Sequence, residues 1–221
     1  MDHAGGGVMT PELVIFDCDG VLVDTEPTTD RVISDNLTRH GLTIAPHEIH
    51  SLFAGGTLKG VGEGAVQRGA RLPPDWLEHA YAEVYAALRA GVDVVPGVID
   101  LIDALDTAGV PMAIASNGPP QKMEISLAAS GLWDRFAGRI YSAYDHAPKP
   151  DPAMLRHAMQ VAGAAPNATW MIDDMPAGWR AAQAAGCGCF AYVAEGGPAR
   201  AAGYPSTPVT AMAQIAAALG I

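Results

Sequence analysis

The sequence predicts an α/β fold in which a doubly wound parallel sheet carries helices on both faces and receives an inserted helical unit. Three observations predict this fold class. Short apolar runs recur along the chain, helix-like segments separate them, and a glycine follows each of four such segments. Strands that alternate with helices are typical of a parallel sheet, because a crossover must return the chain to the same edge.

Five apolar runs are the expected strands of the core. The first, Leu13–Phe16, contains two β-branched residues and ends abruptly in polar ones; the others are residues 110–115, 139–142, 169–172 and 189–193. Helical spacing fills residues 98–108, 120–130, 152–162 and 177–185, and each of these segments is followed by a glycine, which ends a helix readily. We therefore expect a Rossmann-like core, with one short strand and an alanine-rich helix after Gly203.

Residues 26–93 interrupt this rhythm. They contain no strong strand, two stretches have apolar residues at helical spacing, and residues 53–64 are rich in glycine, as expected of a loop between helices. We expect an α-helical cap domain at residues 26–93, inserted into a core domain that consists of residues 1–25 and 94–221.

The chain is acidic, with 24 acidic and 13 basic residues and a formal net charge of −11. Nucleic-acid binding depends on a basic surface, so we expect no nucleic-acid partner. No apolar run approaches the ~18 residues of a membrane span, and residues 1–10 do not resemble a signal peptide, so we expect no membrane partner. Three cysteines without zinc-like spacing favour a reducing compartment. We expect a cytoplasmic protein that is a monomer or a homodimer.

Asp17 and Asp19 follow the first expected strand. Residues two apart in an extended segment point to the same side, where two carboxylates repel unless a cation or a shared proton compensates. An ordinary Asx turn would also explain this Asp-Cys-Asp-Gly sequence. A calcium-binding loop would not, because its twelfth position requires glutamate and is Thr28 here.

Three further groups of polar residues follow expected strands. Ser116 and Asn117 precede an expected helix, whose N–H groups suit an anion, although an ordinary helix cap is the alternative. Lys149 lies between two prolines that stiffen its loop, so it could pair with a nearby carboxylate and a phosphate oxygen. The alternative is that it is a solvated surface lysine. Asp173 and Asp174 are adjacent carboxylates, one of which would serve as a helix cap; as hard oxygen ligands they favour Mg²⁺ over zinc.

Because parallel strands share one carboxyl edge, all four groups are predicted to meet there, where open α/β sheets bind ligands. Such a set suits phosphate chemistry. A phosphate dianion repels an attacking carboxylate, and Mg²⁺ together with an ammonium group would screen that repulsion.

The sequence resembles the haloacid dehalogenase superfamily, in its helical-cap branch of β-phosphoglucomutase-like and phosphoglycolate phosphatase-like phosphatases. The resemblance is carried by FDCDGVLVDTEP (16–27), SNG (116–118), KPDP (149–152) and IDDMPAGWRAAQAAG (172–186). It implies a Mg²⁺-dependent phosphatase that hydrolyses a small phosphorylated metabolite, such as a sugar phosphate, through an aspartyl-phosphate intermediate.

By this resemblance, Asp17 would be the nucleophile. Asp19 would protonate the leaving group and then activate the hydrolytic water. Ser116 and Asn117 would bind the transferring phosphoryl group, and Lys149 would hold that group against Asp17.

The same resemblance implies that Asp174, with Asp173 directly or through a water molecule, holds Mg²⁺ together with Asp17 and the main-chain carbonyl of Asp19. Met175 stands where the family often has a small hydroxyl residue. One hydrogen bond near the metal would therefore be missing, which would loosen the site.

In the cap, the glycine-rich loop with Gly56 and Lys59 corresponds to a segment that reaches the active site in relatives. Lys59 would contact a second polar or anionic group of the substrate, or would be a plain surface lysine. Thr29 stands where sugar-phosphate mutases of this branch carry a histidine. Lys122 and His146 are expected to be surface or packing residues.

Three other functions stay open. A sugar phosphomutase would keep the aspartyl-phosphate until a sugar returned, although Thr29 makes this less favoured. A phosphoacceptor signalling module uses similar residues, but it is shorter and lacks a helical insert. A catalytically silent binding protein would not need every chemical position to be filled. Dinucleotide-binding and P-loop motifs are not found in the sequence.

Overall fold

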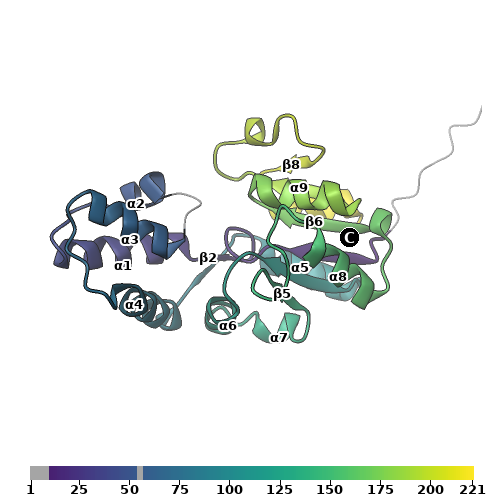
Figure 1. The fold of residues 1–221 in the computed structure, drawn as a ribbon. Coiled ribbons are helices and arrows are strands. Elements are labelled where there is room, and N and C mark those ends of the chain that lie inside the picture. The colour runs from purple at the N-terminus through teal and green to yellow at the C-terminus, as the bar shows by residue number, and fades with distance from the viewer. Residues whose placement is uncertain (1–9, 54–56) are drawn as a thin grey trace, which may run out of the picture.

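The computed structural model describes residues 10–53 and 57–221. In this part of the chain, six parallel strands form the main sheet in the order β5-β4-β1-β6-β7-β8 (Figure 1). In chain order the strands are β1 (Leu13–Phe16), β4 (Met112–Ser116), β5 (Ile140–Ser142), β6 (Thr169–Asp173), β7 (Gly188–Tyr192) and β8 (Thr207–Val209). The predicted α/β parallel fold is confirmed.

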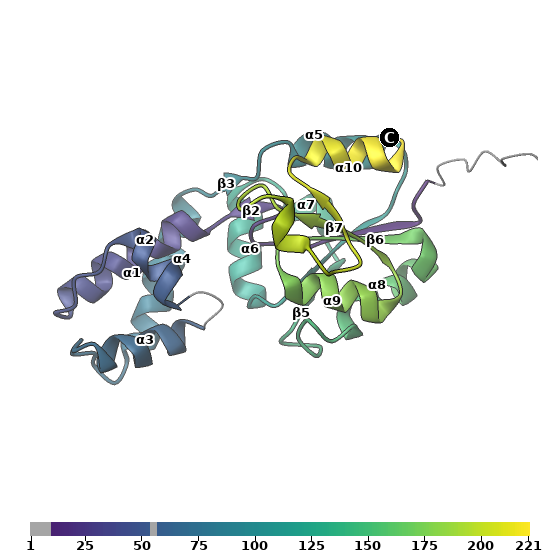
Figure 2. The same ribbon diagram turned by 90° about the horizontal axis from the view of Figure 1, so that it is seen from above.

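Helices cover both faces of the sheet (Figure 2). The first face carries α5 (Val98–Thr107), α6 (Pro120–Ala129), α7 (Trp133–Phe136) and α10 (Met212–Leu219); the second carries α8 (Ala153–Ala162) and α9 (Pro176–Ala185). Side chains of the central strand alternate between them: Val14 and Phe16 pack on the first face, Leu13 and Ile15 on the second. The tail after Gly203 forms β8 and α10, as expected.

Two details of the core follow from single residues. Gly163 and Gly186 end α8 and α9 in the left-handed conformation, with φ of 68° and 81°, as the helix-end glycines predicted. The strand expected at residues 110–115 begins two residues later, at Met112, and ends at Ser116. Pro111 lies before it, because proline has no N–H for a strand ladder.

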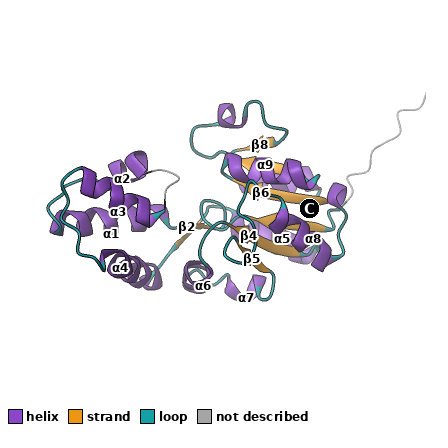
Figure 3. Cartoon of the chain, viewed as in Figure 1, coloured by secondary structure: helices purple, strands orange, loops and turns teal. Residues whose placement is uncertain are grey.

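Residues 26–93 contribute a second, helical unit, on the left in Figures 1 and 3. Its helices are α1 (Glu26–Arg39), α2 (Pro46–Phe53), α3 (Leu58–Gln67) and α4 (Trp76–Ala90). They enclose their own apolar cluster, in which the Trp76 indole N–H donates to Asn36 Oδ1 at 2.6 Å. Two short antiparallel strands, β2 (Val23–Asp24) and β3 (Asp93–Val94), join this unit to the core.

In the described part of the chain, helix packing links the helical unit to the core. Helix α4 packs against α6, and Ile125 of α6 belongs to the apolar cluster of the helical unit. As a result, α6 and the loop before it lie next to the helical unit. No helix among the residues described is long and apolar enough to cross a membrane.

Candidate active site

The carboxyl ends of β1, β5 and β6 bring three of the singled-out side chains into contact. Lys149 follows β5, and its Nζ lies 3.0 Å from Asp17 Oδ1 and 2.6 Å from Asp173 Oδ2. The Lys149 side chain is 3% exposed and that of Asp173 is fully buried. Burial lowers the pKa of Lys149, but its two carboxylate partners outweigh this and raise that pKa above its ordinary value. Lys149 is therefore charged.

Asp173 is fixed by several contacts besides Lys149. The Met175 main-chain N–H donates to its Oδ1 at 2.9 Å, and the Trp179 indole N–H donates to its carbonyl at 2.7 Å. Helix α9 passes so close that a Cβ on Gly178 would stand 1.8 Å from Asp173 Oδ2. A glycine is required at position 178 for the carboxylate to keep this position.

Asp17, Asp173 and Asp174 form a cluster of oxygen ligands. One carboxylate oxygen from each lies within 4.8 Å of the other two. Burial raises the pKa of Asp17 to about 7, an increase that the Lys149 charge opposes and that Asp173 enlarges. Burial, Asp173 and Asp17 together raise the pKa of Asp174 to about 8. Oxygen ligands that crowd in this way suit a hard divalent cation, which would favour their ionised forms.

The main chain after β1 and a nearby arginine border this cluster. The Asp174 carboxylate lies against Gly20, since a Cβ on Gly20 would stand 2.6 Å from Asp174 Oδ2. Met175 supplies no hydroxyl, but Arg200 donates to the Asp174 carbonyl at 3.3 Å and lies 3.8 Å from the Met175 sulfur. Arg200, which the sequence reasoning did not single out, therefore supports this loop from the outer side.

The Asp19 carboxylate lies beside the Ser116–Gly118 loop, since a Cβ on Gly118 would stand 3.6 Å from its Oδ2. It accepts a hydrogen bond from Thr25 Oγ1 at 2.6 Å and pairs with Lys122 Nζ at 2.9 Å. The expectation that Asp17 and Asp19 share one side assumed an extended segment, but β1 ends at Phe16 and the chain turns at Gly20, with φ of 80°. A common direction for the two carboxylates stays a prediction.

The Ser116–Gly118 loop joins the Lys149 loop directly. The Asn117 side-chain amide donates to the Lys149 carbonyl at 3.1 Å and its oxygen accepts from the Lys149 N–H at 2.8 Å. Ser116 Oγ accepts from the Gly118 N–H at 3.1 Å, and Ser142 Oγ donates to the Gly118 carbonyl at 2.8 Å. Ser142 was missed from the sequence, although it ends the strand predicted at residues 139–142.

A cavity of about 350 Å³ lies between this loop and the helical unit. Both parts of the chain line it, including Thr25, Thr29, Tyr81, Asn117 and Lys122. The expectation that Lys122 is a surface or packing residue is wrong, because it lines this cavity and pairs with Asp19. Its place six residues after Ser116, in the first turn of a helix, was the available signal.

The structure does not bring Lys59, one of the two cap residues singled out from the sequence, into the cluster around Asp17. Lys59 is the second residue of α3, and its side chain is 74% exposed, with Nζ 3.9 Å from Glu63 Oε1. It borders a separate, more open groove with Trp76 and Leu77. Gly56 lies outside the described residues. A substrate contact by either residue stays a prediction.

Comparison with known proteins identifies the family of this chain. A model of the haloacid dehalogenase-like hydrolase family matches residues 11–186. The chain belongs to this family. The family that the motifs indicated is therefore confirmed, as is its hydrolase class.

Relatives of this haloacid dehalogenase-like hydrolase include named phosphatases. The 6-phosphogluconate phosphatase of Escherichia coli K12 is 31% identical over 83% of this chain and 83% of its own length. Hexitol phosphatase A of the same organism is 31% identical over 78% of this chain and 79% of its own. These names agree with the phosphoric monoester hydrolase expected from the sequence.

A solved structure shares the whole fold. The crystal structure of a haloacid dehalogenase family hydrolase from Deinococcus radiodurans R1, with bound phosphate and sodium, is 30% identical. It covers 96% of each chain with a TM-score of 0.80. The likeness therefore extends over both the sheet and the helical unit.

Proposed function

We propose that this chain is a Mg²⁺-dependent phosphatase that hydrolyses a small phosphorylated metabolite through an aspartyl-phosphate on Asp17. One observation carries the proposal: a buried lysine bridges Asp17 and Asp173 beside a third carboxylate. Asp17, Asp173 and Asp174, with the main chain at Asp19, would hold the metal. Mg²⁺ would neutralise charge on the phosphoryl oxygens.

Asp17 is oriented for attack on phosphorus. Its Oδ1 accepts from the Cys18 N–H at 2.8 Å and faces Lys149, so we assign Oδ2 as the attacking atom. The new bond joins Oδ2 to phosphorus as the ester P–O bond breaks. Lys149 would attract a phosphoryl oxygen and so lower the repulsion between the dianion and the carboxylate.

Asp19 handles the protons in this scheme. It gives a proton to the leaving oxygen, because an alkoxide is a poor leaving group. Water then attacks phosphorus, Asp19 takes the water proton, and Asp17 is released as a carboxylate. Thr25 orients Asp19 through a 2.6 Å hydrogen bond. Ser116, together with the main-chain N–H of Asn117, would hold the phosphoryl oxygens.

Residues 26–93 are proposed to act as a cap domain that closes over the site and excludes bulk water. Thr29 lines the cavity at the place where a mutase would have histidine, which supports hydrolysis over transfer back to a sugar. The net charge of −11 supports the absence of a nucleic-acid partner. A cytoplasmic location and a monomeric or homodimeric state stay predictions.

The test is a phosphate-release screen over metabolite esters, with Mg²⁺ or with EDTA. Asp17→Asn should lower turnover by at least about 10³-fold, because the nucleophile is lost. Asp35→Asn, the same substitution on an exposed residue of α1, is the matched control and should keep full activity. Release of free phosphate without any isomerised sugar phosphate would identify a hydrolase and exclude a phosphomutase. Equal turnover in both variants would exclude the proposed nucleophile.

A further inference from the structure

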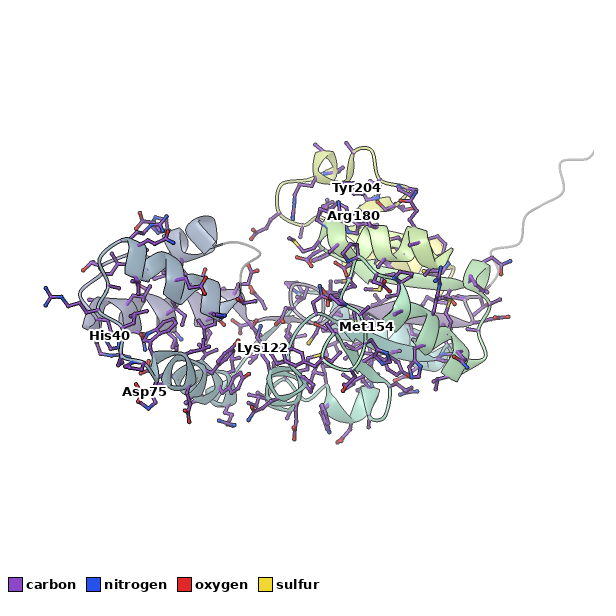
Figure 4. All side chains as sticks on the ribbon, viewed as in Figure 1. His40, Asp75, Lys122, Met154, Arg180 and Tyr204 are labelled. Atoms are coloured by element: carbon purple, nitrogen blue, oxygen red, sulfur yellow. The ribbon has the colours of Figure 1, made fainter. Side chains whose placement is uncertain are left out.

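Lys122 places a positive charge at the boundary between the core and the helical unit, where Figure 4 labels it. Its side chain is 22% exposed, and Nζ lies 2.9 Å from Asp19 Oδ2. The same ammonium also acts on the cap: burial raises the pKa of the Tyr81 phenol on α4, and the Lys122 charge opposes that increase. Lys122 thus faces both the proposed proton donor and the cavity.

The cavity wall combines hydroxyl groups with apolar side chains. Three tyrosines line it, and the rings of two of them, Tyr81 and Tyr85, lie 5.7 Å apart. Thr29 Oγ1 is buried and has no hydrogen-bond partner among the described residues. A buried hydroxyl without a partner is costly, and a hydroxylated ligand would supply one. Ile33 and Val84 provide the apolar surface that covers a carbon chain.

The charge of the cavity wall limits the ligand. Among the lining residues that the structure describes, Lys122 is the single cation, and Glu26 and Asp30 are acidic. Lysine acts on an anion as a compact point charge. A cavity wall with one ammonium group and two carboxylates suits a ligand group with one negative charge better than a second phosphate, which has two.

We propose that Lys122 determines specificity by binding the carboxylate of a phosphorylated hydroxy acid. The inference rests on the proposed function, because Asp19 must lie against the leaving oxygen to protonate it. The leaving group then extends from Asp19 into the cavity, within reach of an ammonium group 2.9 Å from that carboxylate. Its carboxylate would bind Lys122, and its hydroxyl groups would contact the threonine and tyrosine hydroxyls.

The test compares substrates that differ only at this group. Gluconate 6-phosphate and glucitol 6-phosphate have a carboxylate or a CH₂OH at carbon 1; glycerate 3-phosphate and glycerol 3-phosphate form a shorter pair. The wild-type enzyme should prefer the acid in at least one pair. Lys122→Met keeps the side-chain length without the charge. It should lower the acid-to-polyol ratio of kcat/KM by about 10- to 100-fold, mainly through KM for the acid.

Two variants sharpen the comparison. Lys122→Arg restores the charge and should recover part of the preference. Arg31→Met removes a charge from an exposed position of α1 and should keep the wild-type ratio. A fall of kcat by the same factor for acid and polyol in both pairs would overturn the proposal, since Lys122 would then act through Asp19 alone.

The outcome for the wild type separates this inference from the proposed function. Phosphate release with no preference for the acid in either pair overturns the assignment of Lys122 but keeps the phosphatase. Phosphate release only from esters outside these two pairs would likewise overturn the assignment of Lys122 and keep the phosphatase. No release from any ester, with Mg²⁺ present, overturns both.

Discussion

Replacing Lys149 by methionine should cost about 3–5 kcal/mol of the free energy of unfolding near neutral pH. The ammonium is 3% exposed and pairs with two carboxylates, at 3.0 Å and 2.6 Å. Its removal leaves Asp17 and Asp173 facing each other without a cation, and breaking a buried pair in this way has that typical cost. For a chain of this size the melting temperature should fall by about 6–20 °C.

The loss should depend on pH. The pKa of Asp17 is raised to about 7, so the folded chain keeps a proton that the unfolded chain releases between about pH 4 and pH 7. The contribution of this group to stability therefore falls as pH rises through that window. Without Lys149, whose charge lowers that pKa, Asp17 keeps its proton more readily. The variant should lose less stability at pH 5.5 than at pH 8.5.

Urea unfolding in EDTA at both pH values, followed by fluorescence of the four tryptophans, measures this difference. Lys59→Met is the matched control. It changes a lysine whose side chain is 74% exposed and should alter stability by less than about 0.5 kcal/mol. A loss below about 1 kcal/mol for Lys149→Met, or one equally large at both pH values, would refute the reasoning.

Two further results should follow from the same cluster. Mg²⁺ should raise the melting temperature more at pH 8.5 than at pH 5.5, because the pKa values of about 7 for Asp17 and 8 for Asp174 leave these ligands ionised only at the higher pH. Thermal unfolding against Mg²⁺ concentration measures this, and the opposite order would contradict the site. Gly178→Ala should abolish most phosphate release by displacing Asp173, whereas Gly60→Ala, whose Cβ would meet nothing nearer than 3.8 Å, should keep it. Equal activity in the two variants would exclude this steric argument.

Much of the fold was predictable because its signals are local. The apolar run Leu13–Phe16 is a strand over its whole predicted length, and the glycines at 163 and 186 end helices where expected. Contact between Lys149 and Asp17 was also predictable, since both follow parallel strands and such strands end at one edge. These inferences need only the order of elements along the chain.

The surroundings of Lys122 and Asp19 depend on contacts between segments that are far apart in the sequence. Lys122 meets the cavity because α4 packs on α6, and no local pattern in the sequence signals that helix pair. The Asp19 side chain pairs with Thr25 and Lys122, and its spacing from Asp17 does not indicate these partners.

The two lysines near Asp17 and Asp19 show how an acidic chain can handle an anion. At physiological salt, exposed charges are screened over about 8 Å, so the net charge of −11 acts weakly on a ligand inside the site. Contacts of about 3 Å are screened far less. Lys149 has such contacts with the carboxylates that would surround the phosphoryl group, and Lys122 with the acid that would face the leaving group. Because each ammonium serves a different end of the ester, losing Lys149 should affect every substrate alike, whereas losing Lys122 should affect mainly those that carry a carboxylate.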